Sequence, residues 1–130
     1  MNEYKWLSRE AVEIMHEEQI AEHGGLPGLR GENALEAVMA CPLNKAAYGE
    51  SDLFVLAAAY LYGIVRNHPF SDGNKRASYL ATFTFLYING YLIEADDGTI
   101  VAFVEGVAAG EIDEMGTTQF LRDFSIRLAG

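Results

Sequence analysis

Two strongly apolar segments flank the most polar stretch of this 130-residue chain, and they restrict its fold more than any other feature. Residues 53–65 and 77–88 are apolar on nearly every side of a helix drawn through them. A helix that is apolar all round is normally buried on all sides. We therefore expect these segments to be the two central helices of a bundle, the second of them closed by Gly90 as a C-cap.

Weaker helical patterns precede the central pair. Ser8 is a suitable N-cap for a helix that runs to about His23, and a GGLPG turn follows it at residues 24–28. A short second helix is predicted over residues 33–41, because Pro42 is expected to end it. The mixed polar residues 43–51 that follow predict a loop.

The C-terminal third continues the helical pattern. Helices are predicted at about residues 99–109 and 117–128, with an acidic turn at 111–114 between them. Residues 91–94 fit a short extended piece, but no segment is recognised that would pair with it. The prediction is an all-α helical bundle of about six helices, and the length suits a single domain over residues 1–130.

Composition excludes several classes of protein. Half of the residues are hydrophobic, which favours an ordered core, and 19 acidic residues against nine Lys and Arg give a net charge of -10. Such a surface repels phosphate backbones, so no direct nucleic-acid binding is expected. The single cysteine, Cys41, excludes a disulfide scaffold. No signal-peptide core is visible and residues 53–65 are too short to span a membrane, so we expect a cytoplasmic protein without membrane contact.

The polar stretch between the central segments reads His-Pro-Phe-Ser-Asp-Gly-Asn-Lys-Arg over residues 68–76. Three of the nine basic residues, Arg66, Lys75 and Arg76, fall within residues 66–76 against one acid, Asp72. The first turn of the following helix presents unpaired N–H groups and the positive end of the helix dipole, which together bind anions. Two cations are unfavourable at that end of a helix unless an anion lies above them. The stretch therefore predicts a phosphate site.

The other residues of this stretch supply complementary chemistry. Gly73 allows a ligand to approach the backbone, and Asp72 is the carboxylate best placed to hold Mg²⁺ near a phosphate. His68 can accept a proton from an attacking hydroxyl at neutral pH. Phe70 is expected to anchor the loop in the core. Together they indicate phosphoryl or nucleotidyl transfer; the simpler alternative is a plain helix connection in which Asp72 caps the next helix.

The stretch resembles the signature of the Fic/Doc superfamily, His-x-Phe-x-Asp/Glu-Gly-Asn-Gly/Lys-Arg, at nine consecutive positions. Its position between two buried helices also fits that fold. The likeness is to the death-on-curing (Doc) branch in particular, because Lys75 and Tyr79 stand where adenylylating members carry Gly and a second Arg. The GGLPG turn and the stretch Ala-Tyr-Gly-Glu at 47–50 are also similar to that branch.

The resemblance implies a role for each matching residue. His68 would be the general base, Asp72 the Mg²⁺ ligand, and Gly73, Asn74, Lys75 and Arg76 the groups that hold the phosphates of ATP. Arg66 is expected to add charge to the phosphate pocket. Residues 43–51 would form a flap that aligns the target segment.

Doc-type proteins are kinases that phosphorylate a threonine of elongation factor Tu and stop translation, and the resemblance implies this activity here. Lys75 and Tyr79 would reshape the pocket so that the nucleotide binds reversed. Two alternatives remain: a Fic-type adenylyltransferase, which these two residues disfavour, and a catalytically silent binding module of the same fold. The intact His68, Asp72, Asn74 and Arg76 disfavour the silent module.

Regulation is inferred from a missing pattern. Self-restrained Fic proteins carry Ser/Thr-x-x-x-Glu-Gly/Asn, whereas the residues four positions before Glu32 and Glu105 are Gly28 and Val101. With no internal brake, the resemblance implies an antitoxin of the Phd type, whose C-terminal segment folds into a groove of the bundle.

Overall fold

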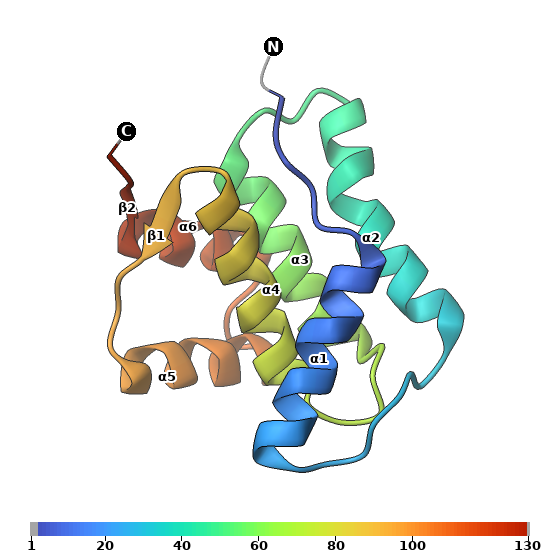
Figure 1. Ribbon diagram of the computed structural model, residues 1–130. Coiled ribbons are helices and arrows are strands. Elements are labelled where there is room, and N and C mark those ends of the chain that lie inside the picture. Colours follow the sequence, from blue (N-terminus) through green and yellow to red (C-terminus); the bar gives the residue numbers. More distant parts are fainter. Residues whose placement is uncertain (1–2, 130) are drawn as a thin grey trace.

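The computed structural model describes residues 3–129, which form six helices and one small two-stranded sheet (Figure 1). The prediction of an all-α helical bundle with about six helices is confirmed. The elements in chain order are α1 (Arg9–His23), α2 (Glu32–Ala47), α3 (Leu53–Asn67), α4 (Asn74–Ile88), β1 (Tyr91–Ile93), α5 (Asp97–Ala108), α6 (Glu114–Phe124) and β2 (Ser125–Arg127).

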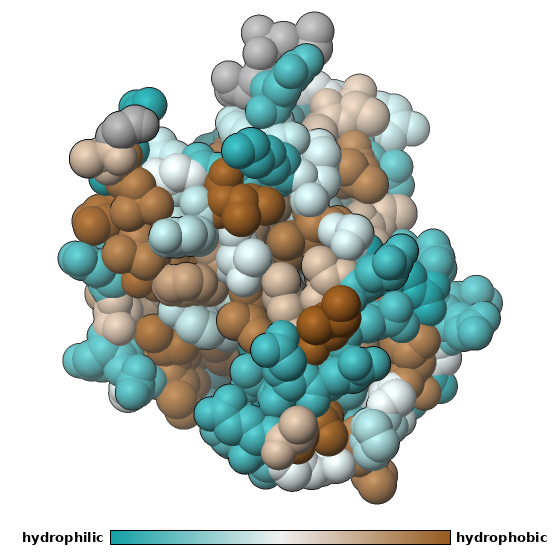
Figure 2. Space-filling view, viewed as in Figure 1, coloured by the Kyte–Doolittle hydropathy of each residue, from teal (hydrophilic) through white to brown (hydrophobic). Residues whose placement is uncertain are grey.

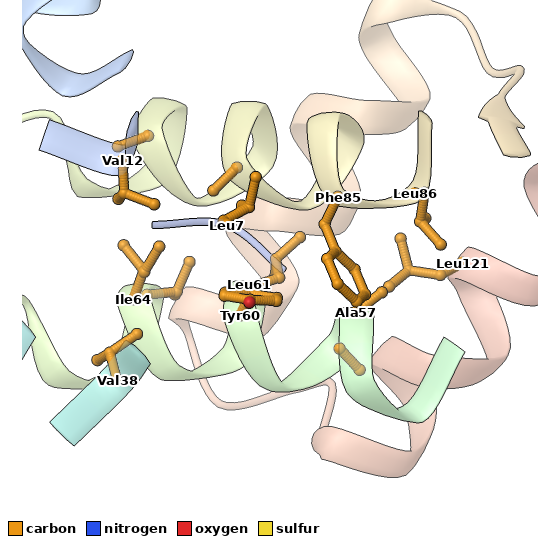
Figure 3. Packing of buried hydrophobic residues seen from close by; sticks show 14 of the residues in the cluster. Leu7, Val12, Val38, Ala57, Tyr60, Leu61, Ile64, Phe85, Leu86 and Leu121 are labelled. Atoms are coloured by element: carbon orange, nitrogen blue, oxygen red, sulfur yellow. The ribbon is translucent and has the colours of Figure 1, made fainter. Parts of the chain in front are cut away.

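Helix α3 lies at the centre of the bundle, in contact with α2, α4, α5 and α6 (Figure 1). Ten of its 15 residues are buried, as its apolar sequence predicts. Figure 3 shows Ile64 of α3 between Val12 of α1 and Val38 of α2, while the rings of Tyr60 and Phe85 meet between α3 and α4. This core fixes both ends of the two central helices and thereby the loop that joins them.

Helix α2 is longer than predicted, because it does not stop at Pro42 but continues to Ala47. Its buried residues Leu35, Val38, Met39 and Pro42 recur at helical spacing and form one stripe. Burial of this stripe outweighs the cost of about 3 kcal/mol that an interior proline imposes on a helix. The predicted loop is correspondingly shorter, since residues 43–47 are helical.

The C-terminal region contains a strand pairing that the sequence did not reveal. β1 pairs antiparallel with β2, with Leu92 opposite Ile126, so residues 125–127 are extended rather than helical as predicted. Helix α6 ends at Phe124, and the N–H of Glu94 donates to the Phe124 carbonyl at 2.7 Å. Strands of three residues carry too little periodicity to be recognised, and the partners are more than 30 residues apart.

Helices α1, α5 and α6 begin at polar caps. Ser8 caps α1, as predicted, by accepting a hydrogen bond from the Ala11 N–H at 3.0 Å, and Asp96 and Asp113 cap α5 and α6 in the same way. In the space-filling view, hydrophilic residues gather over α1 (Figure 2). No helix within residues 3–129 combines the length and the hydrophobicity that crossing a bilayer requires.

Candidate active site

The polar stretch of residues 68–76 forms the connection between α3 and α4; we call residues 68–73 the motif loop. Helix α3 ends at His68, whose N–H donates to the Ile64 carbonyl at 3.1 Å. His68 has φ 48° and ψ 59°, and it is the one non-glycine residue with positive φ among residues 3–129. Left-handed backbone is unfavourable for a side chain with a Cβ and recurs at functional sites. The exposed imidazole is therefore held at the surface by a strained turn.

Asn74 holds the motif loop from inside. Its side-chain Oδ1 accepts from the Phe70 N–H and its Nδ2 donates to the Phe70 carbonyl, both at 3.0 Å. Phe70 itself is 1% exposed, which confirms that it anchors the loop in the core. Because both polar atoms of the Asn74 amide bond Phe70, we expect Asn74 to contribute to anion binding through its backbone N–H at the start of α4.

The connection between α1 and α2, residues 24–31, runs along the motif loop (Figure 1); we call it the α1–α2 segment. Leu29 forms an antiparallel bridge with Phe70, in which the Arg30 N–H donates to the Pro69 carbonyl at 2.8 Å. The Ser71 N–H donates to the Gly28 carbonyl at 3.0 Å. This segment therefore lies directly beside the loop that carries His68.

The flap predicted from residues 43–51 is not in that position. These residues lie before the N-terminus of α3, whereas His68 follows its C-terminus, and a helix of 15 residues separates the two ends by about 22 Å. Asn44, Lys45, Tyr48, Gly49 and Glu50 line a different hollow of about 680 Å³ beside α2, which contains none of the predicted site residues. The segment that contacts the motif loop is the α1–α2 segment, which sequence analysis treated as a turn.

The Asp72 carboxylate is hydrogen-bonded both to the start of α4 and to the α1–α2 segment. One carboxylate oxygen accepts from the Gly73 N–H at 2.9 Å and the other from the Leu26 N–H at 3.3 Å. Gly25 has φ 118°, and a Cβ added to it would meet Asp72 Oδ2 at 2.8 Å, so only glycine allows the α1–α2 segment to come this close. The simpler alternative, in which the Asp72 side chain caps α4, does not hold, because Gly73 occupies the N-cap position and no side chain caps the first turn.

His16 of α1 contacts the same loop from below. It is 2% exposed, its ring stacks on Phe70 at 3.8 Å between centroids, and its Nε2 lies 2.7 Å from the Asp72 carbonyl oxygen. A carbonyl only accepts, so Nε2 carries the proton and donates. One buried ring therefore supports two residues of the motif.

A cavity of about 890 Å³ opens at the N-terminus of α4. Six of the seven predicted site residues line it: His68, Asp72, Gly73, Asn74, Lys75 and Arg76. The volume lies within the range of small-molecule sites. The predicted phosphate and proton-transfer groups are thus brought to one place, where the N–H groups of the first turn of α4 lack intrahelical acceptors.

Arg66 is the exception among the predicted residues. It does not line the cavity, and its guanidinium donates to the Ala108 carbonyl at 3.4 Å, close to Gly110. In this arrangement Arg66 interacts with the C-terminal end of α5, where a cation is favourable for the helix dipole.

Sequence reasoning missed the opposite wall of the cavity, which comes from α5. Asp97, Val101 and Glu105 recur at four-residue spacing, and all three line the cavity. Lys75 Nζ donates to both carboxylate oxygens of Glu105, at 3.0 and 3.1 Å. Tyr79 lines the cavity as well. Burial raises the pKa of Tyr79, and the nearby charge of Asp97 raises it further. The i, i+4 spacing was visible in the sequence, but nothing there indicated which face of α5 meets α4.

The arrangement suits a metal-complexed phosphate. The Asp72 carboxylate retains acceptor capacity beyond its two N–H partners, and a hard cation such as Mg²⁺ accepts one protein carboxylate together with phosphate and water oxygens. Within residues 3–129 there is no cluster of three or more His, Cys, Asp or Glu side chains that would form a metal cage of its own. Such a metal would therefore arrive with its phosphate ligand.

Comparison with known proteins gives concordant matches. A family model described as Fic/DOC family matches residues 6–86, a range that includes the motif loop. The chain is 33% identical over 117 residues to "Protein kinase doc" of Escherichia phage P1, covering 89% of this chain and 92% of that protein. It is 41% identical over 76 residues to "Toxin Doc" of Mycolicibacterium smegmatis, covering 56% of this chain and 58% of that protein. These matches agree with the resemblance drawn from the residues of the motif.

Proposed function

Because the chain belongs to the Fic/Doc family, we propose that it is a Doc-type toxin kinase, which transfers phosphate from ATP to a threonine of a translation protein. The proposed target is elongation factor Tu, and the proposed consequence is inhibition of translation in the cytoplasm. The observation that carries the proposal is the convergence of His68, Asp72 and the first turn of α4 on one cavity. The names of the two relatives, a protein kinase and a toxin, support the same activity.

In the proposed reaction, His68 accepts the proton of the threonine hydroxyl as its oxygen attacks the γ-phosphorus. The bond from the γ-phosphorus to the β–γ bridging oxygen breaks, and ADP leaves with the electron pair of that bond. Asp72 would hold Mg²⁺, which neutralises phosphate charge when it is bound. Asn74, Lys75 and Arg76 would offer the backbone N–H groups of the first turn of α4 at the phosphates, and the side chains of Lys75 and Arg76 would add positive charge. Gly73, which has no side chain, would leave room for a phosphate beside the helix start.

Arg66 does not line the cavity in which the phosphates are proposed to bind. Its guanidinium would have to leave the Ala108 carbonyl to reach the cavity. We therefore assign the neutralisation of phosphate charge to Lys75 and Arg76, whereas Arg66 links α3 to the end of α5.

Transfer of phosphate rather than AMP depends on the nucleotide orientation. Lys75 and Tyr79 replace a Gly and an Arg of adenylylating relatives, and both line the cavity. Their bulk and the pairing of Lys75 with Glu105 would alter the space for the β- and γ-phosphates, so that ATP binds with its γ-phosphate toward His68. An adenylyltransferase is the second candidate, since the same groups could activate a hydroxyl toward the α-phosphorus.

The α1–α2 segment would align the target chain. It lies beside His68 through the Leu29–Phe70 bridge, and Leu26 at its tip is 67% exposed. An exposed apolar side chain on the residue that bonds Asp72 offers a contact for a protein substrate. This replaces the role that sequence analysis assigned to residues 43–51.

An antitoxin of the Phd type is the proposed partner. Apolar side chains from two helices, Leu80 of α4 and Ile100, Val101 and Val104 of α5, line the cavity wall, which would accept an amphipathic segment of the antitoxin. Such a segment would cover the nucleotide cavity directly. Expression of the chain alone should therefore stop growth, and co-expression of the antitoxin should restore it.

The test is intact mass spectrometry of purified elongation factor Tu incubated with this protein, ATP and Mg²⁺, with His68→Ala as the control. A phosphate increment that disappears with the variant supports the kinase. An adenylyl increment keeps the site and assigns the second candidate. No increment of either kind contradicts the proposed target and favours a binding module without catalytic activity.

A further inference from the structure

Among the buried polar side chains near the cavity, His16 has no role in the proposed reaction. His16 lies on α1, 56 positions before Asp72, yet it is 2% exposed and its Nε2 is 2.7 Å from the Asp72 carbonyl oxygen. A donor buried to this degree is costly unless its hydrogen bond is formed. The contact therefore stabilises one particular orientation of the peptide unit between Asp72 and Gly73.

That peptide unit has two accessible orientations. Gly73 has φ 73°, and rotating the peptide by half a turn would give it a negative φ, which glycine adopts equally well. The C=O and N–H of a trans peptide point in opposite directions. In the observed orientation the carbonyl points to His16, and the Gly73 N–H donates to Asp72 Oδ1 at 2.9 Å.

The other orientation would disrupt the cavity. It would turn the Asp72 carbonyl toward the side where the Asp72 carboxylate now accepts from Gly73, and two acceptors would meet there. The carboxylate would lose the Gly73 N–H as a partner and would no longer be held beside the N-terminus of α4. The packing around Gly73 is close: an added Cβ would lie 3.2 Å from Ile20 Cδ1, which offers no donor, and 3.5 Å from His16 Nε2. His16 supplies the hydrogen bond that distinguishes the two orientations.

We propose that His16 is a positioning residue of the anion site: its Nε2–H holds the Asp72–Gly73 peptide so that the Asp72 carboxylate and the first turn of α4 face the cavity together. The inference rests on the proposed function, since it assumes that a metal-complexed phosphate binds there. It makes His16, on the first helix, part of the machinery formed by residues 68–76. His16 itself touches neither phosphate nor metal.

The test compares three variants of the full chain. His16→Phe keeps a ring stacked on Phe70 but removes the donor, His16→Gln keeps a side-chain N–H without the ring, and Ile20→Val trims the packing under Gly73 without touching the hydrogen bond. The probe is magnesium pyrophosphate, measured by calorimetry. The three-bond couplings between the amide proton and the Hα protons of Gly73 report its φ by NMR without any ligand.

We expect His16→Phe to weaken binding by about three- to tenfold, the range of one ordinary hydrogen bond, and to change the Gly73 couplings. His16→Gln should recover most of the affinity, and Ile20→Val should bind as the wild type does. Wild-type affinity and unchanged couplings in folded His16→Phe would overturn the inference. So would a folded His16→Gln that binds as weakly as His16→Phe, because then the ring rather than the donor matters.

Two further outcomes separate this inference from the proposed function. If the wild type does not bind magnesium pyrophosphate, the proposed function fails and the inference fails with it. If the wild type binds and transfers phosphate but His16→Phe binds equally well, the inference alone fails. Should His16→Phe not fold, His16→Gln decides: a folded variant with altered Gly73 couplings and weak binding contradicts the role of the donor.

Discussion

The two ends of helix α3 are built on different principles. At the N-terminus, Asp52 accepts from the Phe54 N–H at 2.9 Å, an ordinary cap between neighbours in sequence, and pairs with Arg122. At the C-terminus, His68 takes a left-handed conformation, and the loop after it is held from distant parts of the chain. The first end closes a helix; the second presents strained, exposed polar groups to a cavity.

At the second end, backbone strain accompanies the groups of the proposed chemistry. A non-glycine residue in the left-handed region costs on the order of 1 kcal/mol, and it persists only where its surroundings enforce it. Around His68 these surroundings include the Asn74 clasp on Phe70 and the bridge to the α1–α2 segment. Substitutions at the two ends of α3 and in the cavity beside its C-terminus should separate these contributions.

The largest effect is expected at His68. Loss of the proposed general base in His68→Ala should reduce the proposed phosphate transfer to elongation factor Tu at least about 100-fold. Stability should not fall with it, and His68→Gly, which removes the strain at φ 48°, should be more stable than His68→Ala by about 0.5–1 kcal/mol. Transfer assays and urea unfolding measure the two effects. A His68→Ala protein that retains activity would contradict the assignment of the base.

The second effect concerns the clasp inside the loop. Asn74→Ala leaves the buried peptide groups of Phe70 without their partners and should lower the free energy of unfolding by about 3 kcal/mol. Asn67→Ala is the matched control, because its single hydrogen bond to the Gly63 carbonyl is exposed and local. It should change stability by no more than about 0.5 kcal/mol. Equal losses in urea unfolding would mean that the loop is not held from inside.

At the other end of α3, Asp52→Ala removes a cap and an ion pair and should cost about 1 kcal/mol at pH 7. Partial burial by itself raises the pKa of Asp52, but the hydrogen bonds from Arg122 and the Phe54 N–H, with the charge of Arg122, lower it overall. A lowered folded-state pKa stabilises the protein above the usual value of about 3.9, and the gain is lost as the pH falls through the folded-state pKa.

Unfolding of wild type and Asp52→Ala in urea, from pH 7 down to pH 2, checks this sign. The difference in stability should shrink at the acid end of the series. A difference that stays constant over the whole range would assign the effect to the cap alone and remove the ionic part.

The smallest effect is expected on the far wall of the cavity. Glu105→Gln removes the carboxylate that holds Lys75 and should strengthen binding of metal-free pyrophosphate about threefold, as expected for an exposed ion pair. Glu111→Gln is the control, an exposed acid outside the cavity. Calorimetric titration distinguishes the two. Weaker binding in Glu105→Gln would mean that Glu105 orients Lys75 instead of competing for it.

Much of the fold was predictable because it follows from local pattern. The span of α1 between Ser8 and His23 and the buried character of α3 came from caps and periodicity, and both are confirmed. Pro42 misled the prediction, since the proline rule is local whereas the buried stripe of α2 depends on contact with α3. The β1–β2 pairing was missed for the same reason, because a three-residue strand is defined by its partner.

The candidate site shows the same difference between local sequence pattern and long-range contact. Residues 68–76 alone predicted which groups the proposed chemistry would use, because they place an imidazole, a carboxylate and a cationic helix start within nine positions. Only the tertiary structure decided what surrounds them: the α1–α2 segment instead of residues 43–51, Glu105 beside Lys75, and His16 beneath Asp72. The physical reason is that helix starts and turns are encoded by neighbours, whereas a cavity wall is formed by side chains far apart in the chain that meet only when the core has packed.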